Sequence, residues 1–148
     1  MHLGQVATEH DVSVRDWTGF RVAAHSGAVG FVLMAFWDDA VLDEYLAGEL
    51  EVFSPATMTD PEQIRARLEV VRSRGWLWST DEYALGVTTV AAAVLDREGH
   101  AVGNLHVHGP SYRFPGTTEP DVLGRIVHER ALAISTVLGF RPQQGNGD

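Results

Sequence analysis

The spacing of apolar residues along the chain predicts two long helices. Between Thr59 and Gly75, apolar positions recur every three to four residues, which places them on one face of a helix. Asp60 suits the N-cap, Pro61 suits the first helical position, and Gly75 suits the C-terminal stop. The stretch 119–140 is also predicted to form a long helix, close to the C-terminus.

Two shorter segments between residues 26 and 50 also favour helices. The stretch 26–37 is almost continuously apolar, and we interpret it as a buried helix, with a buried strand as the alternative. The stretch 38–50 has the pattern of a short amphipathic helix that is capped by an aspartate and ends near Gly48. These segments place helical structure ahead of the long helix at 59–75.

The remaining apolar segments are typical of strands. Residues 76–80 form one short strand pattern, and residues 87–96 and 101–109 form two more, joined by a hairpin signal. Residues 2–8 and 12–17 predict another hairpin near the N-terminus. Helices and strands together predict an α+β domain with a mostly antiparallel sheet flanked by helices.

Composition narrows the possible functions. The 148 residues suffice for one domain, and the 45% apolar and 21% charged fractions are those of an ordinary globular protein. Twenty acidic against eleven basic residues give a net charge of −9, which argues against nucleic-acid contact and against an anionic membrane surface. There is no cysteine, no apolar run long enough to cross a bilayer and no signal-peptide pattern, so we expect a cytoplasmic protein.

The order of these segments resembles the C-terminal effector-binding domain of the IclR family of bacterial transcription regulators, from about His25 to Gly139. Four stretches carry the resemblance: a helix opening of the form His-x-small-x-x-Gly, a Thr-x-Thr-like stretch followed by a helix ending in Arg-x-Gly-aromatic, the family signature before the central strand, and a Ser-x-Ser-Gly-Pro-x-x-Arg-like element. In this sequence they are residues 24–36, 54–76, 79–99 and 106–113.

The resemblance implies a GAF-like fold and a non-catalytic role without a cofactor. In the family, a small molecule binds between the sheet and the segments that cover one face of it. Binding alters the assembly of the protein and its affinity for DNA. We therefore expect residues 1–139 to bind a small organic acid and to self-associate, and residues 140–148 to be a disordered tail. The family's winged helix-turn-helix has no counterpart in this sequence, so we expect either a piece of a regulator or a stand-alone sensor.

The resemblance also implies a set of ligand-binding residues. In the family, the backbone amides at the positions of Ala28 and Val29 hold the ligand's carboxylate, as the unpaired N–H groups at a helix start are suited to do. A glycine-rich turn selected for close packing is the alternative interpretation of this stretch. The full expected set is Ala28, Val29, Gly30, Ser79, Val87, Thr89, His106 and His108.

His106 and His108 stand where the family commonly has two hydroxyl side chains. At spacing i and i+2 they share one face of a strand, and we expect Leu105 and Val107 to face the core. The two imidazoles add roughly eight heavy atoms to a pocket of a few hundred Å³. Ser79 also replaces a common acidic residue. A more anionic ligand, such as a dicarboxylate or an acidic aromatic, is our hypothesis.

Other interpretations of the histidine pair stay open at this point. The pair could hold a metal ion, which requires at least a third ligand such as His25, Asp81 or Glu82, and a metal-dependent enzyme is the corresponding alternative. The domain could also be a degenerate interaction module whose pocket its own side chains fill. We expect Glu82 to support the loop around it, and Trp78 to lie either in the pocket wall or in the core.

Overall fold

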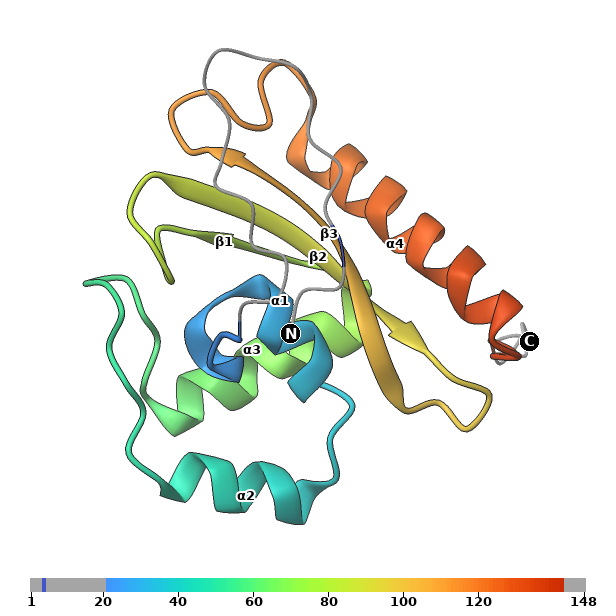
Figure 1. The fold of residues 1–148 in the computed structure, drawn as a ribbon, viewed down its shortest axis with the longest axis horizontal. Helices are drawn as coiled ribbons and strands as arrows, with labels where there is room; N and C mark the ends of the chain where they lie inside the picture. The colour runs from blue at the N-terminus through green and yellow to red at the C-terminus, as the bar shows by residue number, and fades with distance from the viewer. Residues whose placement is uncertain (1–3, 5–20, 143–148) are drawn as a thin grey trace.

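The computed structural model describes residues 4 and 21–142 and has the expected α+β class (Figure 1). The predicted N-terminal hairpin and residues 143–148 of the predicted tail lie outside the described residues. The elements, in chain order, are a 3₁₀ turn η1 (Ala24–Ser26), helices α1 (Ala28–Met34), α2 (Asp39–Ala47) and α3 (Pro61–Arg74), strands β1 (Leu77–Thr80), β2 (Val87–Leu95) and β3 (Ala101–Pro110), and helix α4 (Pro120–Val137).

Helix α3 begins and ends as its local sequence predicts. The Asp60 side chain accepts a hydrogen bond from the Gln63 amide at 2.9 Å, and Pro61 occupies the first turn. Gly75 ends the helix with φ 85°, in the left-handed region that glycine adopts without strain. A Cβ at Gly75 would also lie 2.3 Å from Cε1 of His128, so this position needs glycine for close packing as well.

The apolar stretch 26–37 is helical, which confirms the buried helix and excludes the strand alternative. Phe31, Val32 and Met34 of α1 are fully buried. Helix α2 follows as predicted, although Asp38 at its N-cap makes no side-chain capping hydrogen bond. Phe140, which the sequence prediction assigned to the tail, packs against the core on the α1 side.

The three strands form one antiparallel sheet in the order β1-β2-β3, and the predicted hairpin joins β2 to β3. The register sets Ser79 opposite Thr89 and Thr89 opposite His108, so these residues form a row across the sheet. A register shift lies between Val94 and Leu95, near the far end of the central strand.

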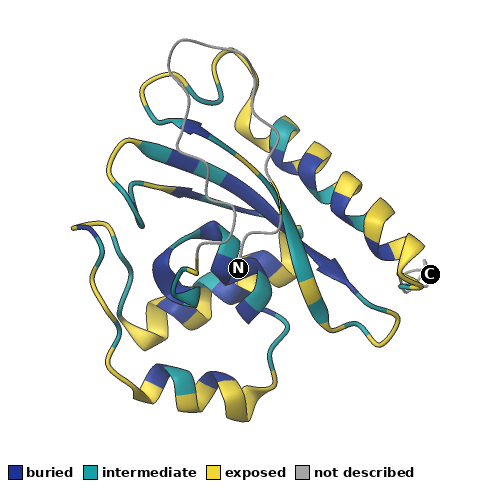
Figure 2. Cartoon of the chain, in the orientation of Figure 1, coloured by how far each residue is buried: buried dark blue, intermediate teal, exposed yellow. Residues whose placement is uncertain are grey.

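Helices cover both faces of the sheet and create two cores (Figures 1 and 2). Helices α1, α2 and α3 lie on one side, with Phe31, Ile64 and Leu68 in the larger core. Helix α4 covers the other side, where Val90 and Val127 are buried. Strand β2 is buried on both faces because each of its faces packs against a helical layer.

The α4-side face of the sheet decides two sequence expectations. Leu105 packs against the α4-side core as expected, and Val107 lies opposite Val90 of that core but stays 40% exposed. Trp78 also packs on the α4 side, with its ring centroid 5.6 Å from that of Phe114. Side chains alternate along a strand, so Trp78 lies on the opposite face from Ser79 and takes no part in a pocket on the α1 side.

Candidate functional site

A cavity lies between the first turn of α1, the α1-side face of the sheet and the loop 81–86. We call it the α1–sheet cavity; its volume is about 70 Å³. The structure brings every residue of the predicted ligand-binding set to its wall: Ala28, Val29, Gly30, Ser79, Val87, Thr89, His106 and His108. Sequence reasoning did not include six further lining residues: Val22, Ser26, Gly27, Glu82, Tyr83 and Ala84.

The floor of the α1–sheet cavity is the row Ser79, Thr89 and His108. These residues belong to three different strands but lie directly opposite one another in the antiparallel register. Directly opposed side chains on one face of a sheet have Cβ atoms about 4.5–5.5 Å apart. The register therefore concentrates two hydroxyl groups and an imidazole on one small area of the sheet.

The start of α1 differs from the expected anion site at one amide. The Ala28 N–H donates to Oγ of Ser79 at 3.0 Å. This amide, which we expected to bind the ligand's carboxylate, is therefore already hydrogen-bonded. The Val29 N–H makes no hydrogen bond to another described residue. Gly30 has a packing role, because a Cβ there would lie 1.9 Å from the carbonyl oxygen of Ala24. The close-packing interpretation of the glycine-rich turn therefore applies to Gly30, and the ligand-binding interpretation is left with the Val29 amide.

His106 and His108 project from β3 into the α1–sheet cavity as a stacked pair. Their ring centroids are 5.5 Å apart and their planes differ by 21°. Nδ1 of His106 lies 2.9 Å from Oδ1 of Asn104, and because a carbonyl oxygen only accepts, this nitrogen is the donor. The stacked rings take up space that two small hydroxyl side chains would leave open, which is consistent with the small cavity volume.

The metal interpretation of the pair finds no further ligand in the described part of the chain. No group of three His, Cys, Asp or Glu side chains among residues 4 and 21–142 could hold a metal ion. His25, one of the suggested third ligands, is buried elsewhere: Nδ1 lies 2.7 Å from the Tyr45 hydroxyl, and Nε2 donates to the Glu51 carbonyl at 2.9 Å. Its two nitrogens therefore hold α2, through Tyr45, and the segment around Glu51.

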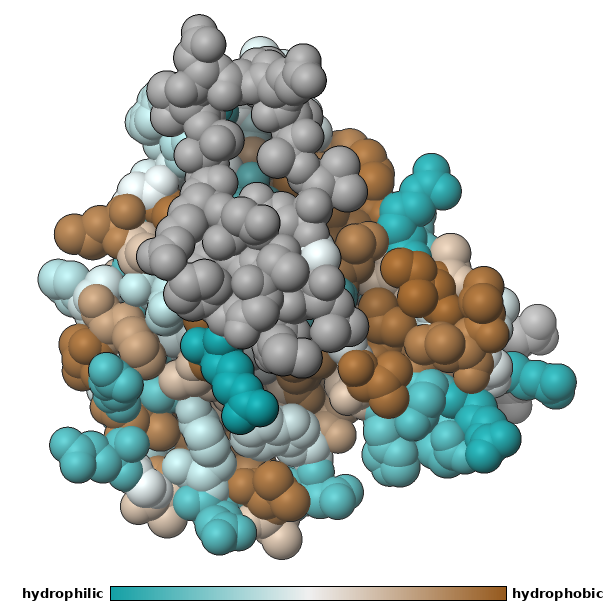
Figure 3. Space-filling model, viewed as in Figure 1, coloured by the Kyte–Doolittle hydropathy of each residue, from teal (hydrophilic) through white to brown (hydrophobic). Residues whose placement is uncertain are grey.

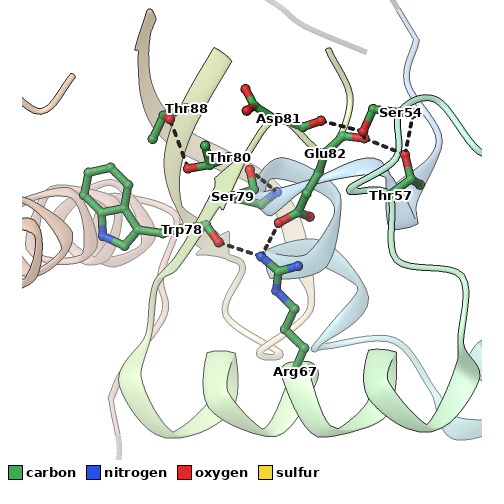
Figure 4. Close-up of polar contacts among 10 residues, drawn as sticks. Ser54, Thr57, Arg67, Trp78, Ser79, Thr80, Asp81, Glu82 and Thr88 are labelled. Atoms are coloured by element: carbon green, nitrogen blue, oxygen red, sulfur yellow. Dashed lines mark hydrogen bonds and ion pairs between the residues drawn. The ribbon is translucent and has the colours of Figure 1, made fainter. Parts of the chain in front are cut away.

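Glu82 reaches the cavity wall from the loop and is held by an ion pair that sequence reasoning missed. Nη2 of Arg67 donates to Oε1 of Glu82 and to the Trp78 carbonyl, each at 2.6 Å (Figure 4). The Arg67 guanidinium also lies 4.7 Å from the centre of the Phe31 ring. Oε2 of Glu82 is buried without a hydrogen-bond partner among the described residues. Burial raises the pKa of Glu82, and Arg67 opposes that shift.

The loop that carries Glu82 is fastened from outside the cavity, as expected for a supporting role. The Ser54 hydroxyl donates to the carbonyl oxygens of Asp81 and Glu82, at 2.5 and 3.1 Å, and the Thr57 hydroxyl donates to the Glu82 carbonyl at 2.6 Å (Figure 4). Asp81 has φ 62°, an unusual conformation for a non-glycine residue, and its side chain accepts from the Gly86 amide. The network fixes this cavity wall.

The described residues form an α+β domain with a small cavity between the start of α1 and one face of the sheet. Residues 1–136 match the family model of the bacterial transcriptional regulator IclR C-terminal domain, and the chain belongs to this family. The resemblance in the sequence and the expected effector-domain fold are thereby confirmed. The class is that of transcription regulators, not of enzymes.

Individual relatives agree with this assignment. The HTH-type transcriptional repressor AllR of Klebsiella pneumoniae is 31% identical over 145 residues, which cover 95% of this chain and 52% of the repressor. AllR of Escherichia coli K12 is 29% identical over 142 residues, covering 94% and 51%. The chain therefore spans about half the length of these repressors.

Solved structures of the family have the same fold. The IclR protein of Thermotoga maritima matches with a TM-score of 0.80 and 29% identity over 91% of this chain and 55% of that protein. The inducer-binding domain of PobR from Acinetobacter, a double mutant in complex with 3-hydroxybenzoic acid, matches with a TM-score of 0.72 and 27% identity, covering 82% and 72%. In the described part of this chain, no helix is long and apolar enough to cross a membrane.

Proposed function

We propose that this domain senses a small organic acid, which binds in the α1–sheet cavity and alters the self-association of the regulator to which the domain belongs. The observation that carries the proposal is the convergence of the eight predicted positions on one cavity of about 70 Å³. Those positions come from α1 and from all three strands, so only the folded chain assembles them. The acid bound by the related PobR domain supports the ligand class.

The groups around the cavity are suited to one end of an anion and one short apolar stem. Ser79 accepts from Ala28, which leaves its own hydroxyl proton to donate, and Thr89 offers a second hydroxyl beside it. The Val29 N–H is a third donor. Apolar side chains at Val22 and Val87 complete the wall. Hydrogen bonds from such donors to a carboxylate are among the stronger ones in proteins.

The cavity volume limits the size of the acid. One water molecule needs about 10–15 Å³ of cavity volume. A cavity of about 70 Å³ therefore accommodates about five to seven water-sized groups. This favours short aliphatic acids over the acidic aromatic ligands that the sequence alone left open.

Self-association and a cytoplasmic location are parts of the same proposal. Helix α4 carries exposed apolar side chains at Val122, Ile126, Ile134 and Val137, and Figure 3 shows hydrophobic residues gathered along this helix. A large exposed apolar surface is typical of an interaction site. A cytoplasmic location follows from the need of a regulator to meet DNA, which the acidic charge of this chain leaves to other parts of the protein.

Isothermal titration calorimetry with acetate, propionate, pyruvate, malonate and benzoate tests the proposal. We expect the short acids to bind, and Thr89→Val to weaken binding about tenfold through the loss of one hydrogen bond to a charged group. Thr136→Val is the matched control, because the Thr136 hydroxyl on exposed α4 bonds only to its own helix at Leu132. Failure of every acid to bind, or equal affinity in the Thr89→Val variant, contradicts the proposal.

The histidine pair provides a second test of the same cavity. In a double His106→Ser, His108→Ser variant the cavity gains the space of roughly eight heavy atoms. We expect this variant to bind benzoate more tightly than the wild-type protein does. Unchanged affinities across the panel would show that the acids bind elsewhere.

A further inference from the structure

Helix α4 has two faces of different character. The face toward the sheet is buried and consists of residues at intervals of three and four: Gly124, Val127, Ala131 and Ser135. The opposite face is exposed and follows the same intervals: Val122, Ile126, Glu129, Ala133 and Val137. We call this exposed set the α4 stripe; four of its five residues are apolar. Figure 3 shows hydrophobic residues gathered along the same helix. An apolar stripe at helical spacing is typical of a surface that packs against another helix.

The α4 stripe is arranged symmetrically about its middle, which lies between Glu129 and Arg130. Two pairs of apolar residues are equally far from this point, at seven and a half and at three and a half residues: Val122 with Val137, and Ile126 with Ala133. In a two-fold symmetric contact, a residue i of one copy faces residue j of the other, and j faces i. The stripe is therefore suited to contact a second copy of itself.

The charged residues at the middle of the α4 stripe distinguish the possible orientations. In an antiparallel pair centred on this point, Glu129 of each copy faces Arg130 of the other, which is exposed beside the stripe. In a parallel two-fold pair, Glu129 would face Glu129 of the second copy, and like charges in contact are unfavourable. An antiparallel pair displaced by four residues would set Glu129 against Ile126 or Ile134. Charge complementarity thus favours one orientation and one register.

We propose that two copies of this chain pair through α4, antiparallel, with Glu129 of each copy against Arg130 of the other. This inference rests on the self-association in the proposed function and adds to it the surface and the geometry of the contact. The pair leaves the α1–sheet cavity accessible, because α4 covers the opposite face of the sheet.

The size of the contact sets the expected strength of the pair. Helix α4 has 18 residues and is therefore about 27 Å long. One pair of such helices buries less than the roughly 1,200–2,000 Å² of a standard interface, so we expect a dissociation constant of about 10–100 µM. Each copy also carries a net charge of −9, and the copies repel at low salt. A salt concentration of about 0.15 M screens this repulsion beyond about 8 Å.

Charge reversal at the centre of the α4 stripe tests the pairing. Sedimentation velocity measures dimerisation of the full chain from about 1 to 300 µM, a range that spans the expected dissociation constant. Glu129→Arg and Arg130→Glu each set like charges against each other twice in the dimer, so each variant alone should dimerise at least about tenfold more weakly than wild type. In an equimolar mixture of the two variants, every such contact again joins opposite charges. The mixed dimer should therefore form with about wild-type affinity.

Two further variants check the specificity of this effect. Glu44→Arg is the matched control, because Glu44 is an exposed residue of α2, on the other side of the sheet, and its reversal should leave dimerisation unchanged (Figure 1). Val137→Ser removes an apolar side chain that is 86% exposed and therefore leaves the core intact. It should weaken dimerisation at least about fivefold through the lost apolar contact. Circular dichroism shows that each variant is folded.

The outcomes separate this inference from the proposed function. Dimerisation that Glu129→Arg and Arg130→Glu leave unchanged, or that their mixture does not restore, overturns the α4 pairing and leaves self-association intact. A wild-type chain that stays monomeric at about 300 µM overturns the α4 pairing together with the proposed self-association. Acid binding is measured separately by calorimetry, so failure of the acids to bind contradicts acid sensing while the α4 pairing stands.

Discussion

The substitution His25→Ala tests how much one buried histidine contributes to the stability of the fold. The side chain is 2% exposed, and its two nitrogens bond to the Tyr45 hydroxyl and the Glu51 carbonyl. The ring also lies near Phe53, with centroids 6.0 Å apart. Two hydrogen bonds contribute about 1 kcal/mol each, and the lost packing adds about 1–2 kcal/mol. We expect unfolding free energy to fall by about 3–4 kcal/mol.

Urea denaturation followed by circular dichroism measures this loss. His25→Phe keeps an aromatic ring and removes the hydrogen bonds, so it should cost about 2 kcal/mol. His100→Ala is the control, because the His100 side chain is 69% exposed in the hairpin, and its unfolding free energy should change by less than about 0.5 kcal/mol. If His25→Ala and His100→Ala unfold at the same urea concentration, the structural role assigned to His25 is wrong.

Three further predictions concern other parts of the fold. Gly30→Ala should destabilise by more than about 3 kcal/mol, since its Cβ would meet the Ala24 carbonyl, whereas Gly103→Ala, with open space around it, should fold normally in the same urea assay. Ser135→Ala should cost about 1–3 kcal/mol in thermal melts, because it leaves the buried Leu95 amide unpaired; a smaller loss would mean that water replaces the hydroxyl. Burial lowers the pKa of His128 below 6.5, so the unfolded chain binds the proton more readily; stability should fall as pH drops below about 6.5, and more steeply than in His128→Gln, while parallel pH profiles of unfolding free energy would contradict this.

Local signals explain why the helices could be predicted. The limits of α3 follow from Asp60, Pro61 and Gly75, each of which acts on its own helix end. The stretch that forms α1 had no such signal, and only its burial between the sheet and α3 separates a helix from a strand there. The positions of the cavity residues could be predicted because matching positions in a family lie in the same places in the fold. The spacing of apolar residues alone does not give this information.

The contacts within the cavity could not be predicted, because they join distant segments. The Ala28–Ser79 hydrogen bond depends on how α1 lies against β1, and the ion pair of Arg67 with Glu82 depends on how α3 packs below the loop. Likewise, the strand pattern alone could not show that Val107 remains 40% exposed, because exposure depends on how far the neighbouring helix extends over β3. Each of these features is set by tertiary packing.

The unsatisfied polar groups argue against a cavity that serves packing alone. A degenerate domain that had filled its pocket would be expected to pair its buried polar atoms, since each unpaired one costs about 1–3 kcal/mol. Here the His106 and His108 rings reduce the space, yet about 70 Å³ remains beside Val29, whose N–H makes no hydrogen bond to another described residue. A ligand oxygen that accepts from this N–H would recover its share of that cost. The histidines are therefore better understood as narrowing a binding site than as closing it.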